Sequence, residues 1–204
     1  MPDNRRERKK EQTRSKIIAV AIQLFRKEGF SETAIDDILA QADVSRGTLY
    51  NYFPDKDSIL AGYFQQKIAA AGETFRTKVL RLKGIRTQLK ALLDLMHRLL
   101  AEDAELAKVY LRYRLKDIGT TSDSSQRKGI ENLVAEVVQA AQAAHEIRTD
   151  LPPAISARNF QLLFMGFLVA GVQAGAADAA QDRLDREQMI ELFLHGAGAR
   201  QQEA

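Results

Sequence analysis

The sequence predicts an all-α protein. Apolar residues recur at spacings of three and four along most of the 204 residues, and the alternating β-branched pattern that is typical of strands is missing. Glycine, proline and polar clusters separate the periodic segments. The helices expected before residue 54 are too few to bury a large core alone. We therefore expect a three-helix N-terminal domain, residues 1–54, followed by a larger helical domain, residues 55–204.

The first expected helix covers residues 13–28 and ends at Gly29. A second begins near Thr33, a third opens at Ser45, and a fourth follows Pro54 and keeps its apolar period up to a break at residues 81–84. A polar connection is expected at residues 119–124 and a soft joint at 177–183. The remaining helices are expected at residues 85–102, 103–118, 125–146, 153–176 and 185–200.

Composition limits the class of protein. Cysteine is absent, which excludes a disulfide framework and thiolate chemistry, and the first residues lack the apolar run of a secretory signal. The longest apolar stretch, residues 162–172, is shorter than the ~20 residues that a membrane span needs. We expect a cytoplasmic protein with 45% hydrophobic residues, ample for a packed core, and no contact with membranes.

Positive charge gathers at the N-terminus, although the whole chain carries a formal charge of only +3. The first sixteen residues form a basic arm that suits a phosphate backbone or the neighbouring minor groove. The alternative is a disordered tail that only aids solubility. The basic residues are Arg5, Arg6, Arg8, Lys9, Lys10, Arg14 and Lys16.

The most specific segment is residues 33–56, which read TAIDDILAQADVSRGTLYNYFPDK. Two short apolar-periodic helices are joined by a polar corner at residues 41–43, which is the layout of a helix-turn-helix. Such a unit holds its second helix in the major groove of DNA. The sequence therefore predicts a protein that binds double-stranded DNA.

The same residues resemble the tetracycline-repressor (TetR) family of regulators, whose signature runs roughly I-A-x-x-A-G-V-S-x-G-T-L-Y-x-Y-F-x-x-K-x-x-L. The resemblance is specific over residues 13–60 and only architectural beyond them. Asp43 stands where the family usually has glycine. If the corner needs a left-handed residue, aspartate tolerates that conformation at a modest cost.

Arg46 is the first candidate for base readout, because a guanidinium can bind guanine O6 and N7 together. In the family pattern Asn51 also faces base edges, and its amide suits adenine. Gly47 weakens a helix, which indicates close approach of the backbone to DNA. A solvated surface role for Arg46 or Asn51, and core packing for Tyr50, are the alternatives. Ser45 is a further DNA-binding candidate, and the resemblance implies phosphate contacts for Thr48, Tyr50, Tyr52 and Lys56. The hydroxyl of Thr33 and the free N–H groups at the start of the second helix suit another phosphate.

A homodimer is expected, because helix-turn-helix proteins commonly pair across a two-fold axis on a near-palindromic operator. In the family the last two helices form the interface; the alternative is that they are the core of a monomer. The larger domain would bind a small hydrophobic or amphipathic effector that lowers DNA affinity, or else a protein partner and no small molecule. Candidate pocket residues, each with ordinary core or surface placement as its alternative, are Met96, His97, Leu100, Tyr110, Tyr113, Arg114, Phe160, Phe164 and Phe167.

Catalysis is not expected. His97, His145 and His195 lack the spacing of a helical metal pair, and no phosphate-binding glycine loop or nucleophile elbow occurs. We therefore expect no metal and no cofactor. The competing hypothesis, a helical enzyme that retains a vestigial DNA-binding unit, has no motif in its favour.

Overall fold

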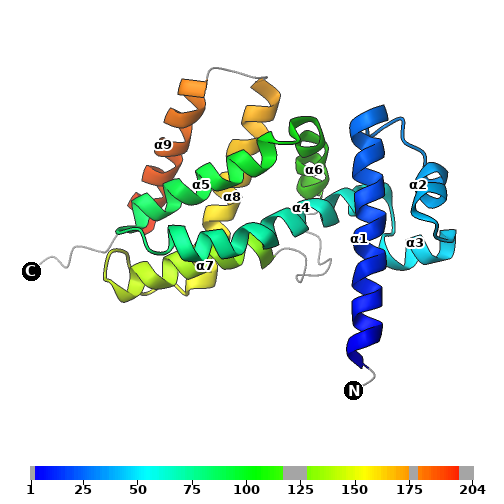
Figure 1. Cartoon of the computed structure of the whole chain (residues 1–204). Coiled ribbons are helices and arrows are strands. Elements are labelled where there is room, and N and C mark those ends of the chain that lie inside the picture. Colours follow the sequence, from blue (N-terminus) through cyan, green and yellow to red (C-terminus); the bar gives the residue numbers. More distant parts are fainter. Residues whose placement is uncertain (1–2, 117–127, 175–178, 198–204) are drawn as a thin grey trace, which may run out of the picture. The chain divides into compact units, whose positions relative to one another are not determined.

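The computed structural model describes residues 3–116, 128–174 and 179–197, and every regular element in these ranges is helical, which confirms the predicted fold class (Figure 1). One element, η1, is a π-helical segment that continues α4. The elements are α1 (Asp3–Glu28), α2 (Ile35–Ala42), α3 (Arg46–Tyr52), α4 (Lys56–Thr74), η1 (Phe75–Val79), α5 (Ile85–Ala101), α6 (Ala104–Lys116), α7 (Lys128–Ala143), α8 (Pro153–Ala174) and α9 (Ala179–Ala197).

The helices form two compact units. The first contains α1, α2, α3, α4 up to Lys67 and residues 104–113 of α6. The second contains the rest of α4, η1, α5, the end of α6 and α7 to α9. The first unit thus extends beyond residue 54, where the sequence places the domain boundary; that boundary stays a prediction.

The core of the first unit is built on α1. Its inward residues between Ile17 and Phe25 are buried at helical spacing, as are Ile38 of α2, Leu49 of α3 and Phe53. Helix α4 approaches closely at Gly62, where an added Cβ would lie 3.1 Å from the Phe53 ring and 3.2 Å from Ile18 Cδ1. The close packing of these helices fixes how α3 is held against α1.

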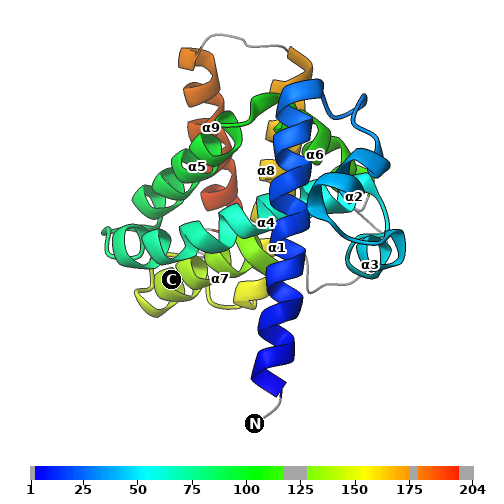
Figure 2. The same ribbon diagram turned by 45° about the vertical axis from the view of Figure 1, so that its right-hand side comes forward.

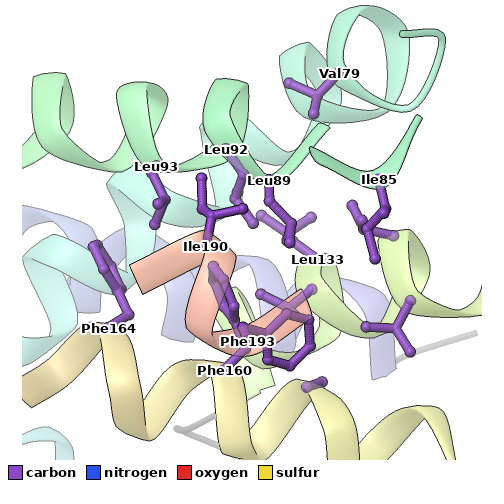
Figure 3. Close-up of a cluster of buried hydrophobic side chains, with 14 of the residues drawn as sticks. Val79, Ile85, Leu89, Leu92, Leu93, Leu133, Phe160, Phe164, Ile190 and Phe193 are labelled. Carbon is purple, nitrogen blue, oxygen red and sulfur yellow. The ribbon is translucent and has the colours of Figure 1, made fainter. Parts of the chain in front are cut away.

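The core of the second unit lies between α5, α7, α8 and α9 (Figure 3). Phe160 and Phe193 meet edge to face with ring centroids 5.1 Å apart. Figure 3 shows leucines of α5 and Ile190 of α9 directed toward the same cluster. Its buried members include Phe75, Val79, Ile85, Leu89, Leu92, Leu93, Met96, Leu133, Val134, Val137, Val138, Phe160, Phe164, Met189, Ile190 and Phe193.

Polar contacts tie distant segments of the second unit together. Arg76 donates from Nε and Nη2 to the two carboxylate oxygens of Glu136, at 3.2 and 2.8 Å. This hydrogen-bonded carboxylate raises the pKa of Arg76 above its ordinary value. Glu146 Oε2 accepts from the Ile85 amide at 2.6 Å and so caps the first turn of α5, after Gly84 turns with φ of 83°.

Two helix starts differ from the predictions. Helix α1 begins at Asp3 rather than near residue 13, because Arg, Lys, Glu and Gln in this segment are good helix formers although none is apolar. Of the soft joint expected at 177–183, residues 177–178 lie outside the described residues, and the rest is wrong, since α9 begins at Ala179, where alanine favours helix. The polar connection expected at 119–124 lies outside the described residues.

Asp43 ends α2 in the left-handed conformation that the sequence suggests, with φ 50° and ψ 55°. We expect Asp43→Gly to raise the free energy of unfolding by about 0.5–1 kcal/mol, because glycine adopts this conformation without a steric penalty. Asp43→Ala should lower it by a similar amount. Urea unfolding checks both variants, and equal stability of the two would contradict the prediction.

Candidate nucleic-acid interface

Helix α3 presents a continuous outer face. Arg46, Gly47, Tyr50 and Asn51 are exposed on it, whereas Leu49 on the opposite side is fully buried. Tyr50 has 44% of its surface exposed, so core packing is excluded for this residue within the unit. The buried leucine holds the inward side of this short helix against the unit. The side chains on the outer side are exposed and therefore available to a partner.

Ser45 fixes where α3 begins. Its Oγ accepts a hydrogen bond from the Thr48 amide at 3.1 Å, and the two hydroxyl oxygens are 2.8 Å apart. This N-cap satisfies one of the unpaired amides at the helix start. Ser45 and Thr48 therefore have a structural role beside the DNA contact that the sequence predicts.

Gly47 has no packing partner in the unit. A Cβ built at this position would meet nothing within 4 Å. Since no close approach within the chain requires glycine here, the absence of a side chain leaves the α3 backbone accessible from outside. The position is consistent with the predicted approach of the backbone to DNA.

Arg46 is exposed and pairs with Asp36 in the first turn of α2. Both side chains face solvent, where such a pair contributes little to stability. The carboxylate instead holds the guanidinium beside the start of α3. This pair could not be predicted from the sequence, because the two residues lie ten positions apart on different helices.

Thr33 and Lys56 are engaged inside the unit. Thr33 is only 2% exposed and its hydroxyl donates to the Gly29 carbonyl oxygen at 2.8 Å. The Lys56 ammonium donates to the carbonyl oxygens of Ser31 and Thr33, at 3.1 and 2.9 Å, and lies 4.7 Å from the Phe30 ring centroid. This differs from the expectation that both side chains face phosphates, because α4 uses Lys56 to hold the connection between α1 and α2.

We expect Lys56→Gln to lower the free energy of unfolding by about 1–2 kcal/mol, because two charge-assisted hydrogen bonds to carbonyl oxygens are lost. The same variant should bind all duplexes more weakly, since the connection leading into α2 loosens. Urea unfolding and fluorescence anisotropy measure the two effects. Lys27→Gln, at an exposed lysine of the same unit, is the matched control. Weaker DNA binding at unchanged stability would instead make Lys56 a phosphate contact only.

The nine residues predicted to line a pocket are divided between the two units. Tyr110 and Tyr113 belong to the first unit, where Tyr110 stacks on Phe64 with ring centroids 4.6 Å apart. In the second unit Met96, Phe160 and Phe164 are buried in the core, while His97 is exposed. The remaining three, Leu100, Arg114 and Phe167, are half-buried.

A different hollow is found in the second unit, of about 270 Å³ and open to solvent. It is lined by Gly84, Ile85, Arg86, Glu146, Ile147 and Leu194. None of these is among the nine predicted residues, and no pattern in the sequence indicated this hollow.

Among the described residues no group of three or more His, Asp or Glu side chains is placed to hold a metal ion. Within those same ranges, no helix is both long and apolar enough to cross a membrane.

The first unit is a helix-turn-helix, with a left-handed corner at Asp43 and an exposed second helix, and this defines the class of DNA-binding proteins to which the chain belongs. Residues 17–63 match the model of the family described as bacterial regulatory proteins, tetR family. The chain belongs to this family and is a DNA-binding transcriptional regulator.

Similar proteins support the assignment over between about half and nearly all of the chain. UidR, an HTH-type transcriptional regulator of Escherichia coli K12, is 23% identical over 156 residues, 76% of this chain and 80% of UidR. The fatty acid metabolism regulator protein of Bacillus subtilis is 29% identical over 93 residues, 46% of this chain and 48% of that protein. The crystal structure of Thermus thermophilus FadR, a TetR family repressor in complex with lauroyl-CoA, superposes with a TM-score of 0.74 at 25% identity, covering 94% of this chain and 98% of FadR.

Proposed function

We propose that this regulator is a homodimeric repressor that leaves a near-palindromic operator when a small amphipathic effector binds its second unit. The observation that carries the proposal is the exposed face of α3, where Arg46 and Asn51 have the side chains that pair with guanine and adenine edges. Tyr50, Tyr52 and Thr48 flank them with hydroxyls suited to phosphate oxygens. The repressor role is supported by likeness to Thermus thermophilus FadR.

DNA selection tests the core of the proposal. The full-length protein is mixed with a pool of random duplexes, and the bound fraction is sequenced after several rounds. We expect a near-palindromic motif, bound far more tightly than random duplex at physiological salt. Equal retention of every sequence would reject a sequence-specific regulator.

The proposed effector is a fatty acyl-CoA, an amphipathic thioester. Its support is the lauroyl-CoA bound in the similar FadR structure, since an amphipathic ligand suits a mostly apolar site between helices. A ligand that binds only the conformer with low DNA affinity shifts the protein away from the operator.

Lauroyl-CoA is the probe for this step, and coenzyme A without an acyl chain is its control. At about 100 times its dissociation constant, the thioester should stabilise the protein by about 2.7 kcal/mol, and it should release the selected duplex. Neither effect is expected from coenzyme A alone. Stabilisation without release would contradict the regulatory step, and no response would favour the alternative in which the second unit binds a protein partner.

The proposed dimer interface uses α8 and α9. Leu162, Leu184 and Leu192 on these helices are 49%, 51% and 63% exposed, so large apolar side chains are available there for burial against a second copy. A Cβ at Gly166 would meet nothing within 4 Å, so a second backbone can come close there. Two such helix pairs would form a four-helix interface.

We expect the Leu162→Glu and Leu192→Glu double variant to be monomeric in analytical ultracentrifugation at micromolar concentration, because facing carboxylates cannot be buried unpaired. Its affinity for the selected palindrome should fall with the loss of the second half-site contact. Leu82→Glu, at an exposed leucine before α5, is the matched control and should stay dimeric. A double variant that keeps the wild-type mass would exclude this interface.

A further inference from the structure

The start of α1 is a helical segment that lies outside the buried core of its unit. Ile17 is the first buried residue of α1, and every side chain described from residue 5 to residue 12 is exposed. Residues 3–12, which we call the α1 extension, span about 15 Å of helix. Figures 1 and 2 both show the extension running past the level of α3, which belongs to the same unit.

The extension and the turn after it hold the net positive charge of the protein. Residues 1–16 contain seven Lys or Arg residues and three carboxylates, a formal charge of +4, whereas the whole chain carries +3. The rest of the chain is therefore close to neutral. Glu7 and Glu11 are one helical turn apart and share a stripe, so the cations occupy the remaining circumference. The exposed cations of the extension are Arg5, Arg6, Arg8, Lys9 and Lys10.

Residues 3–16 include no apolar residue, and this decides the kind of partner. A helix that lies on a membrane, or one that packs against a partner helix, needs an apolar face. A helix of this length without tertiary contacts is only marginally stable in water, so it gains stability when a negatively charged surface neutralises its positive charge. A surface of many phosphates supplies the negative charge and requires no apolar contact.

We propose that the α1 extension binds the phosphate backbone of duplex DNA outside the base pairs that α3 reads. This inference rests on the proposed function, because α3 must first bring the unit onto DNA. A helix of about 10 Å diameter is too wide for a minor groove of about 6 Å, so the extension lies across phosphates and does not enter the groove. The contact is independent of sequence, and it reaches about four base pairs of flanking duplex.

The test compares two duplexes, one ending at the selected motif and one extended by about ten base pairs on each side, across a salt titration. The variant carries glutamine at all five cations of the extension. Its control carries glutamine at five exposed cations of the second unit. Since all these side chains are exposed, both variants should keep the wild-type helical content by circular dichroism. The control positions are Lys78, Arg81, Lys83, Arg98 and Arg158.

Wild type and the control should bind the extended duplex about tenfold more tightly than the short one at low salt, and the extension variant should bind both alike. On the extended duplex the slope of log affinity against log salt should become less steep by about 2–4, since each lost phosphate contact removes about 0.9. Equal slopes for the extension variant and the control would overturn the inference while leaving the motif selectivity of wild type intact. The inference would also be overturned if the extension variant lost a binding to phosphatidylserine vesicles that wild type shows, while its binding to duplex DNA stayed unchanged. A wild type without motif preference would instead defeat the proposed function.

Discussion

Replacement of Arg46 by alanine should weaken binding to each half-site of the selected duplex by about 5- to 150-fold and abolish discrimination at one base pair in it. A bidentate guanidinium contact to guanine contributes about 1–3 kcal/mol of discrimination, and each half-site contains one such contact. Arg46 is exposed at the start of α3 and supports no core packing, so the folded structure should be unaffected. Anisotropy titrations on duplexes substituted one pair at a time measure the effect.

Arg46→Lys separates base readout from charge. Lysine keeps the positive charge and the salt dependence, but it lacks the planar fork, so discrimination should fall while non-specific affinity is retained. Asp36→Asn removes the carboxylate that pairs with Arg46, and Asp37→Asn at the next residue is its control. Retention of full base discrimination in Arg46→Ala would exclude Arg46 from readout and leave Asn51 as the remaining candidate.

Replacement of Phe160 by alanine should lower the free energy of unfolding by about 3–5 kcal/mol. Phe160 is fully buried on α8 and packs edge to face on Phe193 of α9. Truncation removes the apolar contacts of a whole ring and leaves a cavity that the surrounding helices fill only in part. Urea unfolding, followed by circular dichroism at several protein concentrations, measures the change and separates it from dimer dissociation.

Phe160 is also a sequence candidate for the effector pocket, and the size of the effect distinguishes the two roles. A ring that lines an open pocket has fewer contacts to lose than a ring in the core. Leu82→Ala, at an exposed leucine, should change stability by less than about 0.5 kcal/mol. A loss below about 1 kcal/mol in Phe160→Ala would place the ring in a pocket and contradict its position in the core.

The helical class and most helix boundaries were predictable because they depend on local chemistry. Apolar spacing located α5 to within one residue at each end, and Gly29 marked the end of α1. The corner at Asp43 was also predictable, since few residues other than glycine tolerate a left-handed conformation. The start of α1 was missed because an exposed helical segment without apolar residues has no periodic signal.

Contacts between residues distant in sequence could not be predicted. Lys56 resembles a phosphate contact in its motif, yet its ammonium is held by two carbonyl oxygens more than twenty residues earlier. The pairing of Arg46 with Asp36, and the cap that Glu146 places on α5, likewise join segments that lie apart in the sequence. The nine residues expected to line a pocket share an apolar or amphipathic character, but they belong to two units.

The sequence by itself determined the class of this protein, because a helix-turn-helix is specified by a short run of residues whose spacing, corner and cap act within one or two helical turns. Tertiary structure alone decided which polar side chains remain available to DNA and which hold the unit together. The physical reason is that a hydrogen bond to a distant carbonyl or carboxylate depends on how helices pack, and packing is the sum of many contacts that no single segment encodes.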